Sequence, residues 1–129
     1  MNPRRSFALL FDTDPECVGR ARHRIRTMMD GEVDEFVHDA MCVTSEIVTN
    51  AIVHGGPPRA IEATFDTMAG HLHVTVNDGS RRLPCITHGR AIGDGGLGMR
   101  IVSSLASSWG AAAGRPGKTV WFTLERPDP

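Results

Sequence analysis

The chain has 129 residues, a formal net charge of −1 at pH 7 and 40% hydrophobic residues. This length supports one hydrophobic core but hardly two, and the nearly balanced charge gives no electrostatic case for binding nucleic acid. No apolar run is long enough for a membrane span or a signal peptide, and the scattered Cys17, Cys42 and Cys85 indicate reduced thiols, so we expect one cytoplasmic domain over 1–129.

The N-terminal part predicts a strand followed by an amphipathic helix. Phe7, Leu9 and Phe11 alternate with Ala8 and Leu10, which indicates the strand. Residues 14–16 predict the helix start, with a capping aspartate, a proline in the first turn and an acid near the positive helix end. The predicted apolar stripe of this helix consists of Val18, Ala21, Ile25 and Met28.

The other face of this helix carries four arginines. They are Arg20, Arg22, Arg24 and Arg26. A solvated charged face is the simpler interpretation, and a docking surface for an acidic partner is the alternative. A nucleic-acid-binding domain would draw on this face alone, so we do not expect direct contact with nucleic acid.

A long amphipathic helix with a polar ridge is predicted next. Apolar residues recur at helical spacing in two rows: Phe36, Ala40, Val43, Ile47 and Ala51, and beside them Val37, Met41, Val48 and Ile52. Glu46 and Asn50 lie one turn apart, and His54 follows a turn later on the same ridge. These residues suit the activation of a hydroxyl or water and the binding of a hard cation through oxygen. The alternative is a core helix with a solvated polar face.

Two strands joined by a tight turn follow. Residues alternate between apolar and polar over 61–65 and 72–77, and Met68-Ala69-Gly70 turns the chain between them. Asp78-Gly79 ends the second strand. Asp78 could point into a pocket and accept a hydrogen bond from an amino group, or it could be a turn aspartate that bonds its own backbone.

A glycine-rich segment, residues 93–98, precedes a third predicted helix. Its apolar positions are Val102, Leu105, Ala106 and Trp109, and Gly110 predicts its end. Glycines allow a close backbone approach and a helix N-terminus offers N–H groups to an anion, so the segment could cradle phosphate; a flexible hinge is compatible with this. A dinucleotide fingerprint is disfavoured, because no strand directly precedes the glycines and no acid follows them until Glu125.

The last predicted strand is Val120–Leu124. Gly117-Lys118-Thr119 before it resembles the end of a P-loop, but Ala112 stands where the first glycine is required, and a strand follows instead of a helix. The order strand, helix, helix, strand, strand, helix, strand indicates an α+β two-layer sandwich. We expect helices on one face of a mixed, mostly antiparallel sheet.

Taken together, four boxes resemble the Bergerat-type ATP-binding domain shared by histidine kinases, DNA gyrase and heat-shock chaperones. They are Glu46-x-x-x-Asn50-Ala51-x-x-His54, Asp78-Gly79, Gly96-x-Gly98 and Gly117-x-Thr119. Residues 44–51, 108–110 and 117–121 are most similar to bacterial anti-sigma-factor serine/threonine kinases and small actinobacterial ATP-binding regulators. The resemblance runs from about Phe7 to Leu124.

This resemblance implies a role for each matched residue. Asn50 would coordinate Mg²⁺ that bridges the phosphates of ATP, and Glu46 would act as general base toward a serine hydroxyl or water. Asp78 would accept a hydrogen bond from the adenine amino group, and Thr119 would support that contact through water. The nucleotide would also be lined by Gly79, Gly93, Gly95, Gly96, Leu97 and Gly98. An arginine that contacts phosphate stays open among Arg81, Arg82 and Arg90.

The function that the resemblance implies is an ATP-dependent protein serine/threonine kinase. It would phosphorylate an anti-sigma-factor antagonist, sequester a sigma factor and form a homodimer. The alternative is a non-catalytic interaction module, in which ATP orders a lid and favours one binding surface. The presence of Glu46 together with Asn50 favours catalysis, because a pure binding module does not need the base.

Overall fold

The computed structural model describes residues 3–80, 95–114 and 117–129. None of the helices in these ranges is long and apolar enough to cross a membrane. In chain order, the elements are β1 (Arg4–Phe11), α1 (Glu16–Met28), α2 (Asp34–His54), β2 (Arg59–Asp66), β3 (His71–Asp78), α3 (Gly95–Leu105), β4 (Ser108–Ala113) and β5 (Lys118–Glu125).

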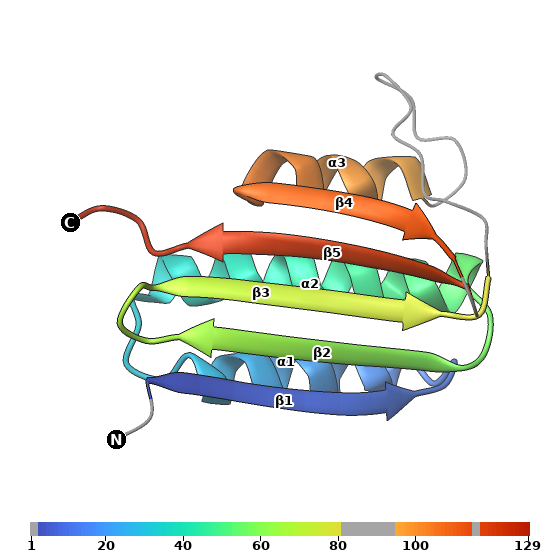
Figure 1. Cartoon of the computed structure of the whole chain (residues 1–129), viewed down its shortest axis with the longest axis horizontal. Coiled ribbons are helices and arrows are strands. Elements are labelled where there is room, and N and C mark those ends of the chain that lie inside the picture. Colours follow the sequence, from blue (N-terminus) through green and yellow to red (C-terminus); the bar gives the residue numbers. More distant parts are fainter. Residues whose placement is uncertain (1–2, 81–94, 115–116) are drawn as a thin grey trace.

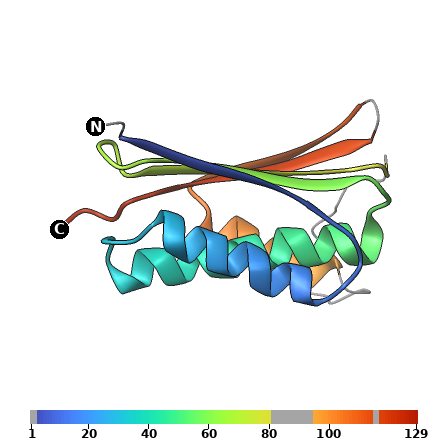
Figure 2. The same cartoon turned by 90° about the horizontal axis from the view of Figure 1, so that it is seen from below.

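The strands form one sheet with the order β1-β2-β3-β5-β4 (Figure 1). The three helices form a second layer on one face of this sheet (Figure 2). The predicted α+β two-layer sandwich is therefore confirmed. Each described strand runs antiparallel to its neighbours, where a mixed, mostly antiparallel sheet was expected.

Alternation along the strands decides which side chains enter the core. In β2, β3 and β5 every second residue faces the helices and is buried. The apolar residues at these inward positions are Ile61, Ala63, Phe65, Leu72, Val74, Val76, Val120, Phe122 and Leu124. They pack against the predicted stripes of α1 and α2, where Ile25 and Ile47 are buried. The same alternation gives Asp78 and Lys118 inward positions at the strand ends.

The prediction for the third helix is wrong at its C-terminal end. α3 ends at Leu105, whereas Trp109 and Gly110 belong to the strand β4. The Ser107 N–H donates to the Thr123 carbonyl oxygen at 2.8 Å, and β4 then pairs with β5. Pairing with an existing strand edge overrides the weak local preference of this segment, because strand formation depends strongly on its neighbours.

Candidate functional site

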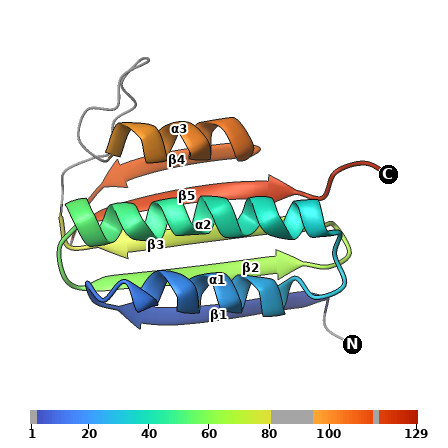
Figure 3. The same ribbon diagram turned by 180° about the vertical axis from the view of Figure 1, so that it is seen from behind.

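Four segments that carry predicted site residues meet at one end of the molecule. These are the C-terminal half of α2, the end of β3, the start of α3 and the start of β5 (Figure 3). α2 lies over the inner face of the sheet and beside α3 (Figure 3). The fold thus brings Glu46, Asn50 and Asp78 to the same end as the first turn of α3.

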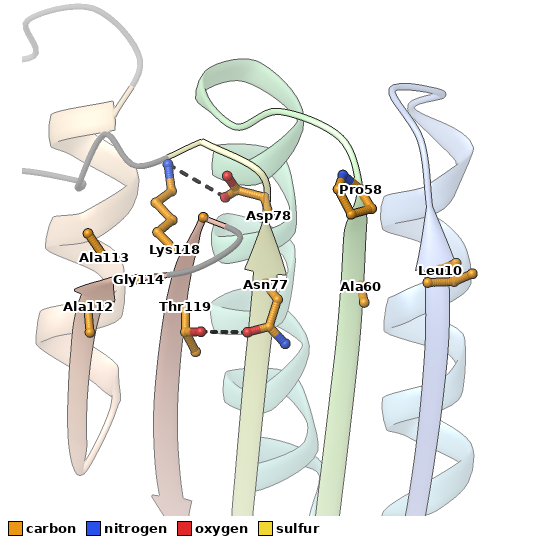
Figure 4. Close-up of a pocket in the computed structure, with 11 residues that line it drawn as sticks. Leu10, Pro58, Ala60, Asn77, Asp78, Ala112, Ala113, Gly114, Lys118 and Thr119 are labelled. Atoms are coloured by element: carbon orange, nitrogen blue, oxygen red, sulfur yellow. Dashed lines mark hydrogen bonds and ion pairs between the residues drawn. The ribbon is translucent and has the colours of Figure 1, made fainter.

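The Asp78 carboxylate is buried, and its two oxygens differ in their partners. Oδ1 accepts hydrogen bonds from the Ser80 N–H at 2.7 Å and the Gly56 N–H at 3.4 Å. Oδ2 lies 3.6 Å from Lys118 Nζ, with both side chains only 1% exposed (Figure 4). No described group donates a hydrogen bond to Oδ2, although the atom is out of reach of solvent. A buried oxygen of this kind is suited to accept a hydrogen bond from an amino group.

Backbone segments pack around Asp78 at distances that only glycine permits. A Cβ at Gly117 would collide with the backbone of Asp78 and Gly79, and a Cβ at Gly79 would collide with the Pro57 carbonyl group. The Gly79 N–H also donates to the Gly56 carbonyl oxygen at 2.6 Å. The loops after α2 and β3 and before β5 are therefore locked together, which fixes the direction of the Asp78 side chain.

The polar ridge of α2 passes from a half-buried to a buried environment. Glu46 is half-buried, whereas Asn50 is only 8% exposed, one turn later. His54 is half-buried, and its Nε2 is shielded from solvent with no hydrogen bond from the described residues. Glu46 thus keeps contact with solvent, as a group that accepts a proton from an incoming hydroxyl requires.

The C-terminal turn of α2 is held by Arg59, which the sequence analysis missed. Arg59 is the first residue of β2 and is 8% exposed. Its Nε donates to the Ala51 carbonyl oxygen at 2.8 Å, and its Nη2 donates to the Gly55 carbonyl oxygen at 3.1 Å. The sequence did place an arginine at the start of an apolar strand, and a buried arginine must find hydrogen-bond acceptors, so this position could have indicated its role.

Thr119 lies next to the residue that pairs with Asp78, so its support of the adenine contact through water stays a prediction. Thr119 stands opposite Asn77 in the pairing of β5 with β3, and its Oγ1 donates to Asn77 Oδ1 at 2.5 Å on the outer face of the sheet (Figure 4). Lys118 stands opposite Asp78 on the inner face. A difference of one residue reverses the face of a strand, so Lys118 and not Thr119 is the neighbour of Asp78.

The glycine-rich box falls partly inside α3. Gly95, Gly96, Leu97 and Gly98 form the first turn of this helix, whose backbone N–H groups lack intrahelical acceptors. Such a turn can donate to an anion. Gly93 and the candidate lid arginines Arg81, Arg82 and Arg90 lie outside the described residues.

A shallow cavity of about 360 Å³ opens on the outer face of the sheet near the same strand ends (Figure 4). Leu10 and Ala60 border one side, Ala112 borders the other, and Asn77 and Thr119 lie between them. No residue of α2 lines this cavity. It is therefore separate from Glu46 and Asn50, which belong to the helix layer.

The described residues contain no cluster of three or more His, Cys, Asp or Glu side chains that could hold a metal ion. A metal at this end of the molecule would therefore have few ligands among the described residues, of which the Asn50 carboxamide oxygen is the candidate. Mg²⁺ fits such a set, because it is often held by one or two protein oxygens together with substrate phosphates.

Comparison with known proteins identifies the family of this domain. A family model described as the histidine kinase-like ATPase domain matches residues 11–124. This range includes all the elements from α1 to β4 and nearly all of β5. No curated protein matches the chain significantly.

Solved structures share the fold at low sequence identity. The RsbU and RsbW domains of Rv1364c from Mycobacterium tuberculosis match with a TM-score of 0.73 and 18% identity, over 97% of this chain and 33% of that one. The histidine kinase domain of a blue-light activated histidine kinase from Erythrobacter litoralis matches with a TM-score of 0.53 and 21% identity, over 87% of this chain and 60% of that one. The chain therefore spans a third to three-fifths of the length of these structures.

Proposed function

This chain belongs to the histidine kinase-like ATPase domain family, and on this basis we propose that it is an ATP-binding regulatory protein of the anti-sigma-factor kinase type. In this proposal it transfers a phosphoryl group from ATP to a serine or threonine of an anti-sigma-factor antagonist. It also sequesters a sigma factor and acts as a homodimer. The sequence boxes that resemble anti-sigma-factor kinases support the choice of partners.

The observation that carries the ATP-binding part is the Asp78 carboxylate. Its Oδ1 is engaged by backbone N–H groups, while its buried Oδ2 accepts no hydrogen bond from the described residues. The exocyclic amino group of adenine is a donor that would satisfy Oδ2. Leaving a buried acceptor without a partner is costly, so a ligand that donates to Oδ2 gains free energy on binding.

The remaining residues would act on the phosphate end of the nucleotide. ATP, when bound, supplies the phosphoryl group that is transferred. The Asn50 carboxamide oxygen would be a ligand of Mg²⁺, and the backbone N–H groups of Gly96 and Gly98 would donate to phosphate oxygens. Glu46 would accept the proton of the attacking hydroxyl group. In such reactions the protein contributes mainly positioning and charge stabilisation.

The presence of Glu46 supports a kinase over a non-catalytic module gated by ATP. Glu46 lies one turn before Asn50 on α2 and is half-buried. Asn50 alone would suffice to hold a metal-bound nucleotide. A half-buried carboxylate at this position is suited to accept a proton from a hydroxyl group.

The test is an incubation of the purified protein with Mg²⁺ and ATP labelled at the γ-phosphate. Proteins captured from the native cell serve as candidate acceptors, and labelled proteins are then identified by mass spectrometry. We expect label on a serine or threonine of a small captured protein and capture of a sigma factor. Capture that depends on ATP without transfer of label would instead establish the interaction module, and the kinase proposal would be rejected.

A further inference from the structure

We propose that Lys118 reads the base of the nucleotide together with Asp78. The carboxylate would accept a hydrogen bond from the amino group of adenine, and the ammonium group would donate to the neighbouring ring nitrogen N1. Lys118 would then determine specificity for the base together with Asp78, a role that was not expected of Lys118 from the sequence. This inference rests on the proposed binding of ATP.

The geometry of the pair suits two parallel hydrogen bonds. Lys118 Nζ and Asp78 Oδ2 are 3.6 Å apart, which is beyond a hydrogen bond but close enough for both to reach neighbouring atoms of one ligand (Figure 4). Nζ offers only donors and a carboxylate oxygen only accepts. The adenine edge presents a donor, the amino group, directly beside an acceptor, N1. The pair therefore has the complementary order of donor and acceptor.

The burial of the pair also favours a ligand that contacts both groups. Both side chains are 1% exposed, so each has lost nearly all its contact with solvent. A buried ion pair at long distance recovers little of its desolvation cost unless further hydrogen bonds satisfy its polar atoms. Oδ2 accepts no hydrogen bond from the described residues. A base whose amino group bonds to Oδ2 would supply the hydrogen bond that this oxygen lacks among the described residues.

The residue type is a further indication. The chain has 14 lysines and arginines, and Lys118 is the only lysine among them. An arginine beside Asp78 would form a two-pronged bond with the carboxylate and occupy Oδ2. A lysine is a compact charge, so it neutralises Asp78 at 3.6 Å and leaves Oδ2 open to a ligand.

The first experiment changes the ligand and leaves the protein intact. The wild-type chain is titrated by calorimetry with ATP and with 1-deaza-ATP, in which a C–H group replaces N1, both with Mg²⁺. Loss of a hydrogen bond from a charged donor should weaken binding of the analogue roughly 10- to 100-fold. Equal affinity for ATP and 1-deaza-ATP would overturn the assignment of Lys118.

The second experiment tests whether Lys118 is the donor. The variant Lys118→Met should bind ATP more weakly than wild type and should no longer distinguish ATP from 1-deaza-ATP. The control Arg26→Met removes an exposed positive charge on α1 and should keep the wild-type ratio of the two affinities. If Lys118→Met keeps that ratio, another group reads N1 and the proposal fails.

A third measurement does not depend on the stability of any variant. Labelling with ¹⁵N,¹³C-lysine gives one lysine side-chain signal, because the chain has one lysine. Saturation with ATP should shift the Nζ resonance of Lys118, and 1-deaza-ATP should shift it less. An Nζ resonance that is the same with and without saturating ATP would contradict the proposal.

These outcomes separate the two levels of inference. Absence of binding to ATP, with the protein folded, would reject the proposed function itself. Binding of ATP without discrimination against 1-deaza-ATP would reject only the role of Lys118. Tighter binding of GTP than of ATP would assign the pair to the edge of guanine and would also overturn the adenine proposal.

Discussion

Arg59 Nε donates to the Ala51 carbonyl oxygen at 2.8 Å and joins the last turn of α2 to the first residue of β2. The last carbonyl groups of a helix lack donors within the helix, so they need partners from elsewhere. Arg59 supplies two such bonds, because its Nη2 also reaches the Gly55 carbonyl oxygen. The turn that it holds is the one that follows Asn50.

Replacement of this arginine should lower the stability of the protein. Arg59→Met removes a charged donor from the Gly55 carbonyl oxygen and a second one from the Ala51 carbonyl oxygen, which keeps only the Gly55 N–H. We therefore expect the free energy of unfolding to fall by about 2–3 kcal/mol in urea denaturation. Arg26→Met, at an exposed position of α1, should change it by no more than about 0.5 kcal/mol. A similar loss in both variants would show that the bonds from Arg59 contribute nothing specific.

Two glycines of the loop before β5 should respond differently to the same substitution. A Cβ at Gly117 would collide with the backbone of Asp78 and Gly79, whereas a Cβ at Gly114 would meet, among the described residues, only the Gly117 carbonyl oxygen at 4.0 Å. Gly117→Ala should therefore lower the free energy of unfolding by about 1–3 kcal/mol. Gly114→Ala is the matched control and should leave the free energy of unfolding nearly unchanged, with both variants measured by thermal unfolding. An equal loss of stability in both variants would refute the close packing around Asp78.

Loss of the Glu46 carboxylate should separate catalysis from binding. In Glu46→Ala the acceptor hydroxyl has no base, so the rate of phosphoryl transfer should fall by about 10²–10⁴-fold while the affinity for ATP stays unchanged. Glu62→Ala, on the exposed face of β2, is the control. Transfer at the wild-type rate in Glu46→Ala would exclude Glu46 as the base.

Neutralisation of Asp78 should weaken the binding of ATP at its adenine base. Asp78→Asn removes the negative charge at Oδ2 and weakens this acceptor, so the affinity for ATP should fall roughly 10- to 100-fold in a titration. Asp66→Asn makes the same change at the end of β2 and should leave this affinity intact. Unaltered binding by a folded Asp78→Asn variant would remove Asp78 from the site.

The turn between β2 and β3 should respond to acid. The Ala69 N–H, and then the Met68 N–H, donate to Asp66 Oδ1 at 3.0 and 2.9 Å and lower the pKa of this carboxyl below its ordinary value of 3.8. A lowered folded-state pKa contributes stability that is complete above pH 3.8 and is lost as the pH falls through the folded-state value. Asp66→Asn should therefore reduce the loss of stability as the pH falls below 3.8, as measured by urea denaturation at each pH.

Most of the fold could be predicted because its elements are strongly periodic. The stripe of α2 and the alternation of β3 each identify one buried face, and the order of elements then indicates two layers. β4 could not be predicted, since Ser108–Ala113 forms a strand only through its pairing with β5. Local preference carries little information at such an edge.

The direction of a candidate site residue could be predicted where the alternation of its own strand determines it. Asp78 follows the alternation of β3, so its inward direction could be read from the sequence. The choice between Lys118 and Thr119 needed the register of β5 against β3, which the sequence alone does not give. Alternation in β5 gives Lys118 the same face as Val120 and Phe122, but it does not show which residue stands opposite Asp78.

Because the chain has one lysine, proteolysis at this residue can report on the separation of strands in the sheet. An endoproteinase that cuts only after lysine has a single target here, the bond between Lys118 and Thr119. That bond lies in β5, which is flanked by β3 and β4 on its two sides. Digestion must wait until these neighbours separate, so the rate of appearance of two fragments measures how often the strands come apart.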